Sequence, residues 1–134
     1  MISLTRLTLA VGLTMASVGV QASPAVDTLQ ADYRQQGVTQ FDAEAGRQLW
    51  NREFNTQTGP ARSCAGCHSD DPRRVGKHVK TGKAIEPMAP SVNPKRLTDE
   101  KHMRKWFHRN CKWTIGRECT AQEQGDVLEY LQGR

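Results

Sequence analysis

The feature that most constrains this chain is the pentapeptide Cys-Ala-Gly-Cys-His at residues 64–68. In a C-x-x-C-H sequence the two thiols lie about one helical turn apart and can bond covalently to the two vinyl groups of a haem, while the histidine reaches the iron. A chain of 134 residues with 37% apolar residues has a small core of its own, so an additional source of stability is expected. The motif predicts one haem c attached to Cys64 and Cys67, with His68 as the proximal iron ligand.

Other uses of the four cysteines are weaker alternatives. A redox dithiol would use the C-x-x-C pair, and a zinc site could be completed by Cys111 and Cys119. The chain has neither the βαβ pattern of thioredoxins nor a second C-x-x-C, so both alternatives are disfavoured. Because haem attachment uses two cysteines, Cys111 and Cys119 are expected to form a disulfide in an oxidising compartment.

Residues 1–22 have the composition of a secretory signal peptide. Arg6 is their only charged residue, an apolar run follows from Leu7 to Val20, and small residues precede a cleavage position after Ala22. The run is shorter than the roughly 20 residues that cross a bilayer, so no stable membrane anchor is expected. Residues 23–134 would then be a single cytochrome domain in the periplasm, where thiols are oxidised.

The charged residues are distributed unevenly along the chain. The formal net charge is +5, and residues 72–112 contain twelve Lys and Arg against three Asp and Glu. Such a basic segment predicts a docking face for an acidic partner, with an ordinary solvated face as an equal alternative. Nucleic acid is not expected as a partner of a secreted protein.

Apolar spacing and capping residues predict helices throughout the organised part of the chain. Helices are expected behind caps at Asp42, Thr98 and Thr120, the last of these in a capping box. Residues 23–40 are expected to be a loosely packed lead-in with one short helical stretch. Residues 70–94 contain four prolines and two glycines, so no long element is expected there.

The first and last of these three helices are expected to cross. Gly46 has no side chain and would allow the first helix to approach the last one near Val127 and Leu131. The last helix is expected to bury Val127, Leu128 and Leu131. Helices alone would then account for the organised parts of the chain.

The helix behind Thr98 carries the second candidate iron ligand. Its apolar residues Met103, Trp106 and Phe107 are spaced i, i+3 and i+4, and the i+7 position of the same stripe is Asn110. A carboxamide where a core residue is expected is either a hydrogen-bonded buried asparagine or a weak oxygen ligand. His102 and His108 point away from the stripe and are expected at the surface.

Met88 is the alternative sixth ligand. It lies in Glu86-Pro-Met-Ala-Pro90, downstream of the proximal histidine, and a thioether there would make a saturated, high-potential electron carrier. A loop or core methionine is the simpler interpretation. The motif alone therefore leaves the sixth ligand open.

Longer stretches resemble the sphaeroides haem protein (SHP) family of small, high-spin class I cytochromes c. The resemblance covers Ala61 to Thr120, and the asparagine-cysteine pair followed by a second cysteine is far more specific than C-x-x-C-H. Beyond the C-x-x-C-H motif, it is carried by Pro87-Met-Ala-Pro-Ser91, Asn93-Pro94, Trp106-Phe-His-Arg-Asn-Cys111 and Gly116-Arg-Glu-Cys-Thr120.

The resemblance implies an all-α, class I cytochrome c-like fold of three to five helices around a covalently bound haem, with one disulfide. It places the haem on Cys64 and Cys67, His68 as proximal ligand and Asn110 as the sixth ligand of ferric iron, and it maps the family's disulfide onto Cys111 and Cys119.

The same resemblance implies that the asparagine leaves on reduction and that oxygen, nitric oxide or carbon monoxide then binds. A carboxamide oxygen is a hard, weak donor that suits ferric better than ferrous iron, which agrees with this. A dihaem cytochrome c and a membrane cytochrome b are the implied electron donors. The alternatives are a plain electron carrier with His68 and Met88 as ligands, or an oxygen reductase or nitric oxide dioxygenase at the same haem.

Overall fold

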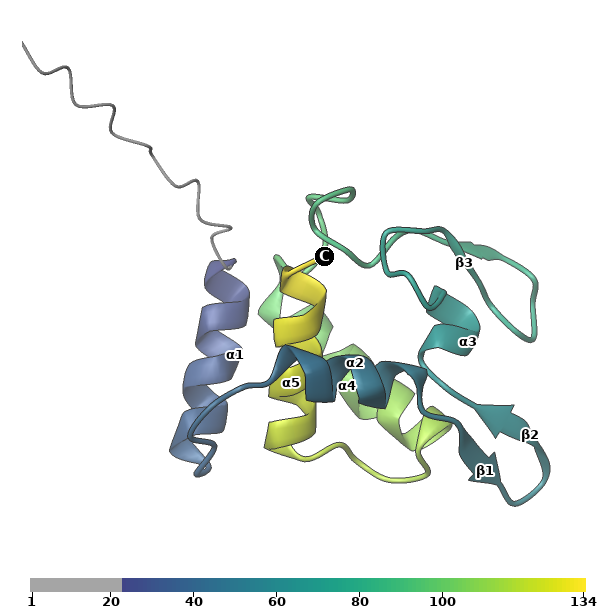
Figure 1. Ribbon diagram of the computed structural model, residues 1–134, viewed down its shortest axis with the longest axis horizontal. Coiled ribbons are helices and arrows are strands. Elements are labelled where there is room, and N and C mark those ends of the chain that lie inside the picture. The colour runs from purple at the N-terminus through teal and green to yellow at the C-terminus, as the bar shows by residue number, and fades with distance from the viewer. Residues whose placement is uncertain (1–22) are drawn as a thin grey trace, which may run out of the picture.

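The computed structural model describes residues 23–134, which form five helices and four short strands (Figure 1). The helices are α1 (Pro24–Gln35), α2 (Ala43–Asn51), α3 (Ala65–His68), α4 (Glu100–Thr114) and α5 (Ala121–Gln132). The signal peptide expected at residues 1–22 lies outside the described residues. Within the described part of the chain, no helix is long and apolar enough to cross a bilayer.

Helix α1 is better packed than the loose lead-in expected for residues 23–40, so that expectation is wrong. Ser23 caps the helix by accepting a hydrogen bond from the Val26 amide at 3.2 Å, and Pro24 occupies the first turn. The side chains of Val26, Leu29 and Tyr33 share one face at i, i+3 and i+7, and all three are buried in the core. This stripe makes α1 part of the packed domain.

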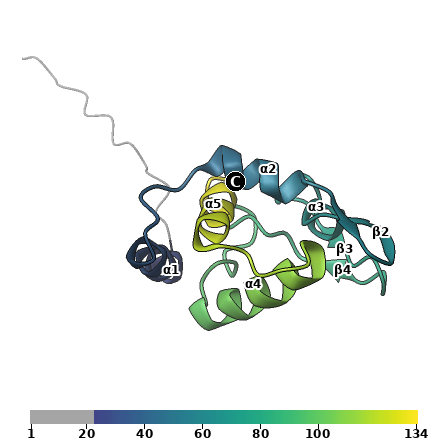
Figure 2. The ribbon, with the colours of Figure 1, turned by 90° about the horizontal axis from the view of Figure 1, so that it is seen from below.

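Helices α2 and α5 cross at close range, as the sequence predicts (Figure 2). A Cβ atom on Gly46 would lie 2.0 Å from the backbone oxygen of Asp126, so only glycine fits at this crossing. The contact falls at Asp126 and Tyr130, beside the predicted Val127 and Leu131. The Asp126 carboxylate also accepts a hydrogen bond from the Asp42 amide at 2.8 Å, which ties the start of α2 to α5.

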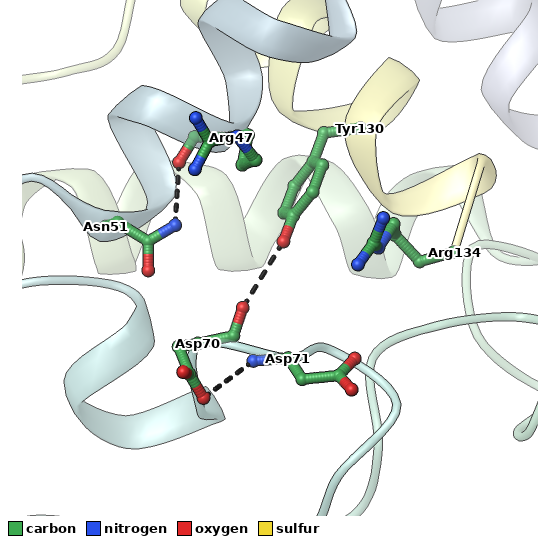
Figure 3. A pocket seen from close by; sticks show the side chains of 6 residues that line it. All are labelled: Arg47, Asn51, Asp70, Asp71, Tyr130 and Arg134. Atoms are coloured by element: carbon green, nitrogen blue, oxygen red, sulfur yellow. Dashed lines mark hydrogen bonds between the residues drawn. The ribbon is translucent and has the colours of Figure 1, made fainter.

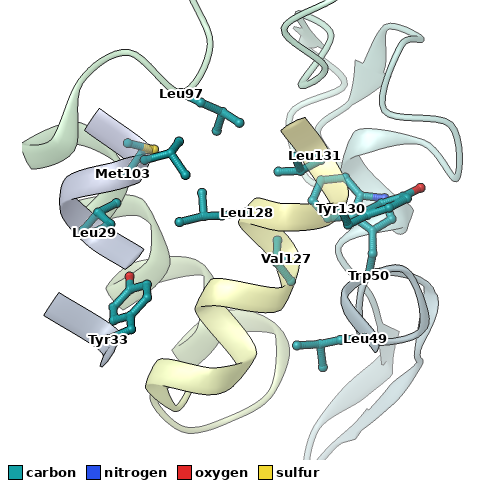
Figure 4. Packing of buried hydrophobic residues seen from close by; sticks show 11 residues of the cluster. Leu29, Tyr33, Leu49, Trp50, Leu97, Met103, Val127, Leu128, Tyr130 and Leu131 are labelled. Carbon is teal, nitrogen blue, oxygen red and sulfur yellow. The ribbon is translucent and has the colours of Figure 1, made fainter. Parts of the chain in front are cut away.

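The core is formed mainly by α1, α2 and α5 (Figure 4). Helix α5 begins with the predicted capping box, in which Thr120 and Glu123 satisfy each other's backbone amides. It buries Val127, Leu128 and Leu131 as predicted. The Leu128 side chain is completely buried between α1 and the remaining helices, so it lies at the centre of the core.

Helix α4 begins one residue later than expected. Asp99 is the cap and accepts a hydrogen bond from the His102 amide at 2.8 Å, whereas the Thr98 hydroxyl donates to the Lys95 carbonyl. Thr98 was the predicted cap, and this assignment is wrong because its hydroxyl is already bonded within the preceding turn. A carboxylate at the positive end of the helix is also the more favourable group.

Two antiparallel hairpins correct the expectation that helices alone account for the organised parts. The first pairs β1 (Phe54–Thr56) with β2 (Gly59–Arg62), and the second pairs β3 (Gly76–Lys77) with β4 (Ala84–Ile85). Inside the second hairpin, His78 Nδ1 accepts from the amides of Lys80 and Thr81 at 3.3 and 3.2 Å. This local hydrogen bonding closes a turn in a segment that has no helical periodicity.

Candidate haem-attachment site

The C-x-x-C-H segment forms the short helix α3, which places its two thiols one turn apart. The amides of Cys67 and His68 both bond to the Cys64 carbonyl, at 3.2 and 3.0 Å. Both cysteines are free thiols and partly buried. Burial raises the pKa of the Cys64 thiol to about 11. A thiol held this firmly in its protonated form is unsuited to disulfide exchange, which argues against a redox dithiol.

His68 has the properties of a metal ligand that is kept neutral. Burial is the main cause that lowers its pKa to about 4, helped by the positive charge of Arg96 and by His78. Its Nδ1 atom is buried and has no hydrogen-bond partner among the described residues. A neutral imidazole beside two thiols is the donor set that a c-type haem requires, so these residues fit the cofactor.

Helix α2 and strand β3 hold the α3 segment in place. The Trp50 indole Nε1 donates to the Ser69 carbonyl at 2.9 Å, and the Trp50 ring centroid lies 5.5 Å from that of His68. A Cβ atom on Gly76 would lie 2.1 Å from the Cys67 carbonyl oxygen, so the β3 backbone packs directly on the motif. Sequence reasoning missed both positioning residues, because neither Trp50 nor Gly76 belongs to a local motif.

The turn that follows α3 is anchored to α5 (Figure 3). The Tyr130 hydroxyl donates to the Asp70 carbonyl at 3.3 Å, and the Asp70 carboxylate accepts from the Asp71 amide at 2.9 Å. A cavity of about 320 Å³ adjoins this turn and is lined by Arg47, Asn51, Asp70, Asp71, Tyr130 and Arg134. This lining has opposite charges and none of the predicted ligands, so the cavity is separate from the haem site.

Asn110 lies on α4 and is half-buried, next to the buried Cys111. Cys111 forms the predicted disulfide with Cys119, with a Cα–Cα distance of 5.6 Å. Along the predicted stripe Met103 is buried and Phe107 is half-buried, but Trp106 is 40% exposed. The expectation that Trp106 is a core residue is therefore wrong: it stacks loosely with His102, at a centroid distance of 5.8 Å, on the outer side of the helix.

The alternative ligands are placed less favourably. Met88 is half-buried and packs against the hydrophobic core, with its amide bonded to the Pro72 carbonyl at 2.8 Å. His102 and His108 are exposed, as predicted. The disulfide removes the cysteines that a zinc site would need, and residues 23–134 contain no other cluster of three or more His, Cys, Asp or Glu that could hold a metal.

Comparison with known proteins identifies the family. Residues 36–131 match a family described as a domain of unknown function, DUF1924. The cytochrome c-type protein SHP of Cereibacter sphaeroides is 43% identical over 106 residues, which cover 77% of this chain and 79% of that protein. The chain belongs to the SHP family of c-type cytochromes. Membership confirms the family that the motifs indicated and the expectation of haem c as cofactor.

Solved structures of the family confirm the predicted fold. Oxidised SHP, described as an oxygen-binding cytochrome c, aligns with a TM-score of 0.75 and 38% identity, covering 85% of this chain and all of that one. The solution structure of cytochrome c'' from Methylophilus methylotrophus aligns with a TM-score of 0.71 and 31% identity, over 81% of this chain and 93% of that one. The mostly helical class I cytochrome c-like architecture with one disulfide is therefore that of the SHP family.

Proposed function

We propose that this SHP-family protein is a periplasmic monohaem cytochrome whose sixth ligand, Asn110, leaves the iron on reduction. Cys64 and Cys67 would hold the haem and His68 would be the permanent ligand. Loss of the asparagine would open a position for oxygen or another diatomic molecule. The observation that carries the proposal is the half-buried Asn110 carboxamide, on the inner stripe of α4 and next to a disulfide-linked cysteine.

The ligands differ in the strength with which they would hold the iron. When bound, the haem supplies a one-electron couple and an iron that can accept a small ligand. His68 is neutral at physiological pH and sits between helix α2 and strand β3, so it is available in both oxidation states. The Asn110 oxygen is a weak, hard donor, so its affinity falls when the iron gains an electron. Released, the carboxamide stays close enough to hydrogen-bond a small ligand.

Descriptions of the relatives support such a switch. The solved SHP structure is described as that of an oxygen-binding cytochrome c. The solution structure of cytochrome c'' is described as giving insight into haem-ligand detachment. A family in which one member binds oxygen and another releases a ligand is consistent with a breakable bond in this chain.

The electron donor would approach the basic segment at residues 72–112. Within it the second hairpin exposes Lys77, Lys80 and Lys83, and the side chains of Val75 and Val79 are each 60% exposed. Apolar groups with a positively charged surround suit a transient complex with an acidic redox protein. A dihaem cytochrome c, itself served by a membrane cytochrome b, is the donor we propose.

Optical spectra of the holoprotein in both oxidation states test the sixth ligand. Asn110→Ala is expected to change the ferric spectrum and to leave the ferrous spectrum close to that of the wild type, because only ferric iron uses the asparagine. Met88→Leu is the matched control and is expected to change neither. Ferrous wild-type protein is expected to bind carbon monoxide readily.

Two results would contradict the proposal. An unchanged ferric spectrum in Asn110→Ala would remove the asparagine from the iron. A ferric spectrum changed by Met88→Leu, together with the loss of a thioether-to-iron charge-transfer band, would support the plain electron carrier with His68 and Met88 as ligands.

A further inference from the structure

Trp113 joins three segments of the chain that are far apart in the sequence. It lies on α4, one turn beyond Asn110, and its side chain is half-buried. The guanidinium carbon of Arg62, at the end of β2, lies 3.5 Å from the Trp113 ring centroid. The ammonium nitrogen of Lys80, in the turn of the second hairpin, lies 4.3 Å from the same ring. The indole ring is therefore a common contact for both hairpins.

The Arg62 side chain also caps the end of α4. Its Nη1 atom donates a hydrogen bond to the Trp113 carbonyl at 2.8 Å. This carbonyl belongs to the last turn of a helix that ends at Thr114, where backbone acceptors lack partners within the helix. A cation at this negative end is favourable, so Arg62 is held by a ring and by a backbone dipole at once.

These contacts connect the two segments that carry the iron ligands. Arg62 is two residues before Cys64, so its position is coupled to the start of the attachment motif. Trp113 is three residues after Asn110, and side chains three apart on a helix are neighbours on one face. The Cys111–Cys119 disulfide fixes the same turn of α4 to the following loop. Arg62 and Trp113 provide a second attachment, on the side of the motif.

We infer that the contact of Arg62 with Trp113 is a tether that keeps Asn110 within reach of the iron, an inference that rests on the proposed role of Asn110. A weak ligand binds only when its backbone is already in position, because the bond itself contributes too little to order a helix end. Trp113 and Arg62 are positioning residues in this view, and Lys80 reinforces them. Loosening the tether releases the asparagine more often without removing it.

Binding of cyanide to the ferric holoprotein measures this release, because cyanide must displace the sixth ligand. Trp113→Leu removes the aromatic ring and is expected to accelerate cyanide binding by roughly three- to tenfold, the factor that corresponds to one cation–π contact. Trp113→Phe retains a ring and is expected to restore most of the wild-type rate. Arg62→Met keeps the length of the side chain and is expected to resemble Trp113→Leu, whereas Arg52→Met, at an exposed arginine beyond α2, is the matched control.

Hydrogen exchange of the amides at residues 110–115 in the ferric holoprotein gives an independent readout. Exchange there is expected to be faster in Trp113→Leu and Arg62→Met, and unchanged in α1 and α5, because the tether acts on one end of α4. Thermal unfolding of each variant shows whether the whole domain is weakened. A uniform rise in exchange through α1 and α5 would contradict a local tether.

The outcome separates this inference from the proposed function. If Asn110→Ala changes the ferric spectrum but Trp113→Leu binds cyanide at the wild-type rate, the tether is wrong and the ligand assignment stands. If Asn110→Ala leaves the ferric spectrum and the cyanide rate unchanged, the proposed function is wrong. A Trp113→Phe variant as fast as Trp113→Leu would also overturn the tether, because the ring would then contribute nothing.

Discussion

The helices α1, α2 and α5 and the segment from Arg62 to Thr114 are stabilised in different ways. Three of the four largest fully buried side chains, Val26, Leu29 and Leu128, lie in α1 and α5. In the described residues, the large apolar side chains that remain well exposed all lie in the second region, namely Val75, Val79, Val92 and Trp106. The first region is a self-contained helical core, whereas the second is organised around the ligands that it presents.

Polar groups show the same contrast. Helices α1, α2 and α5 each begin at a capping side chain, from Ser23, Asp42 and Thr120. Helix α3 has no side-chain cap, and the Nδ1 atom of its His68 is buried without a partner. Buried polar groups without partners destabilise a fold. The comparison teaches that local stability has been given up where the chain presents its iron ligand.

The crossing of α2 and α5 offers the most severe way to test the first region. Gly46→Ala places a Cβ atom 2.0 Å from the Asp126 backbone oxygen, a clash that no side-chain movement can relieve. We expect the free energy of unfolding to fall by about 3 kcal/mol or more, measured by urea denaturation of the holoprotein. Gly133→Ala, whose Cβ would have no neighbour closer than 3.8 Å, is the matched control and should have little effect. A wild-type midpoint for Gly46→Ala would contradict the close crossing.

Truncating one buried and one exposed apolar residue compares the two regions directly. Leu128→Ala is expected to cost about 3–4 kcal/mol, because the side chain is fully buried and its removal leaves a cavity. Val79→Ala removes a side chain that is 60% exposed and should change stability by less than about 0.5 kcal/mol. Urea midpoints of the two holoprotein variants provide the measurement. Comparable losses would mean that the second hairpin contributes to the core.

Tyr33 gives the first region a dependence on alkaline pH. Burial raises its pKa from 10.0 to about 12, and its hydroxyl donates to the Gln124 side chain at 2.8 Å. The folded state therefore keeps a proton that the unfolded chain loses, so this contribution is fully present below pH 10 and is lost as the pH rises to about 12. The two-unit shift corresponds to about 2–3 kcal/mol.

Urea unfolding at pH 9 and at pH 11.5 measures this loss. The wild type should lose more stability between these two values than Tyr33→Phe, which has no hydroxyl proton to release. Equal losses in both proteins would show that other groups, such as the lysines of the second region, account for the alkaline dependence.

Much of the site was predictable because its chemistry is local. The C-x-x-C-H motif, the Cys111–Cys119 disulfide and the capping box at Thr120 depend on residues close together in the chain, and each is found as predicted. The packing of α1 was missed because its stripe of Val26, Leu29 and Tyr33 is short and lies in a polar stretch. Its value becomes evident only when α5 lies against it.

The sequence by itself determined the family and the covalent chemistry of this protein, because thiols, an imidazole and cysteine spacing act over one or two turns of helix. Only the tertiary structure decided which residues hold those groups in place. Trp50 and Gly76 position the His68 segment, and Arg62 meets Trp113 across 51 residues. Such contacts depend on how the chain folds back on itself, and no local periodicity encodes them.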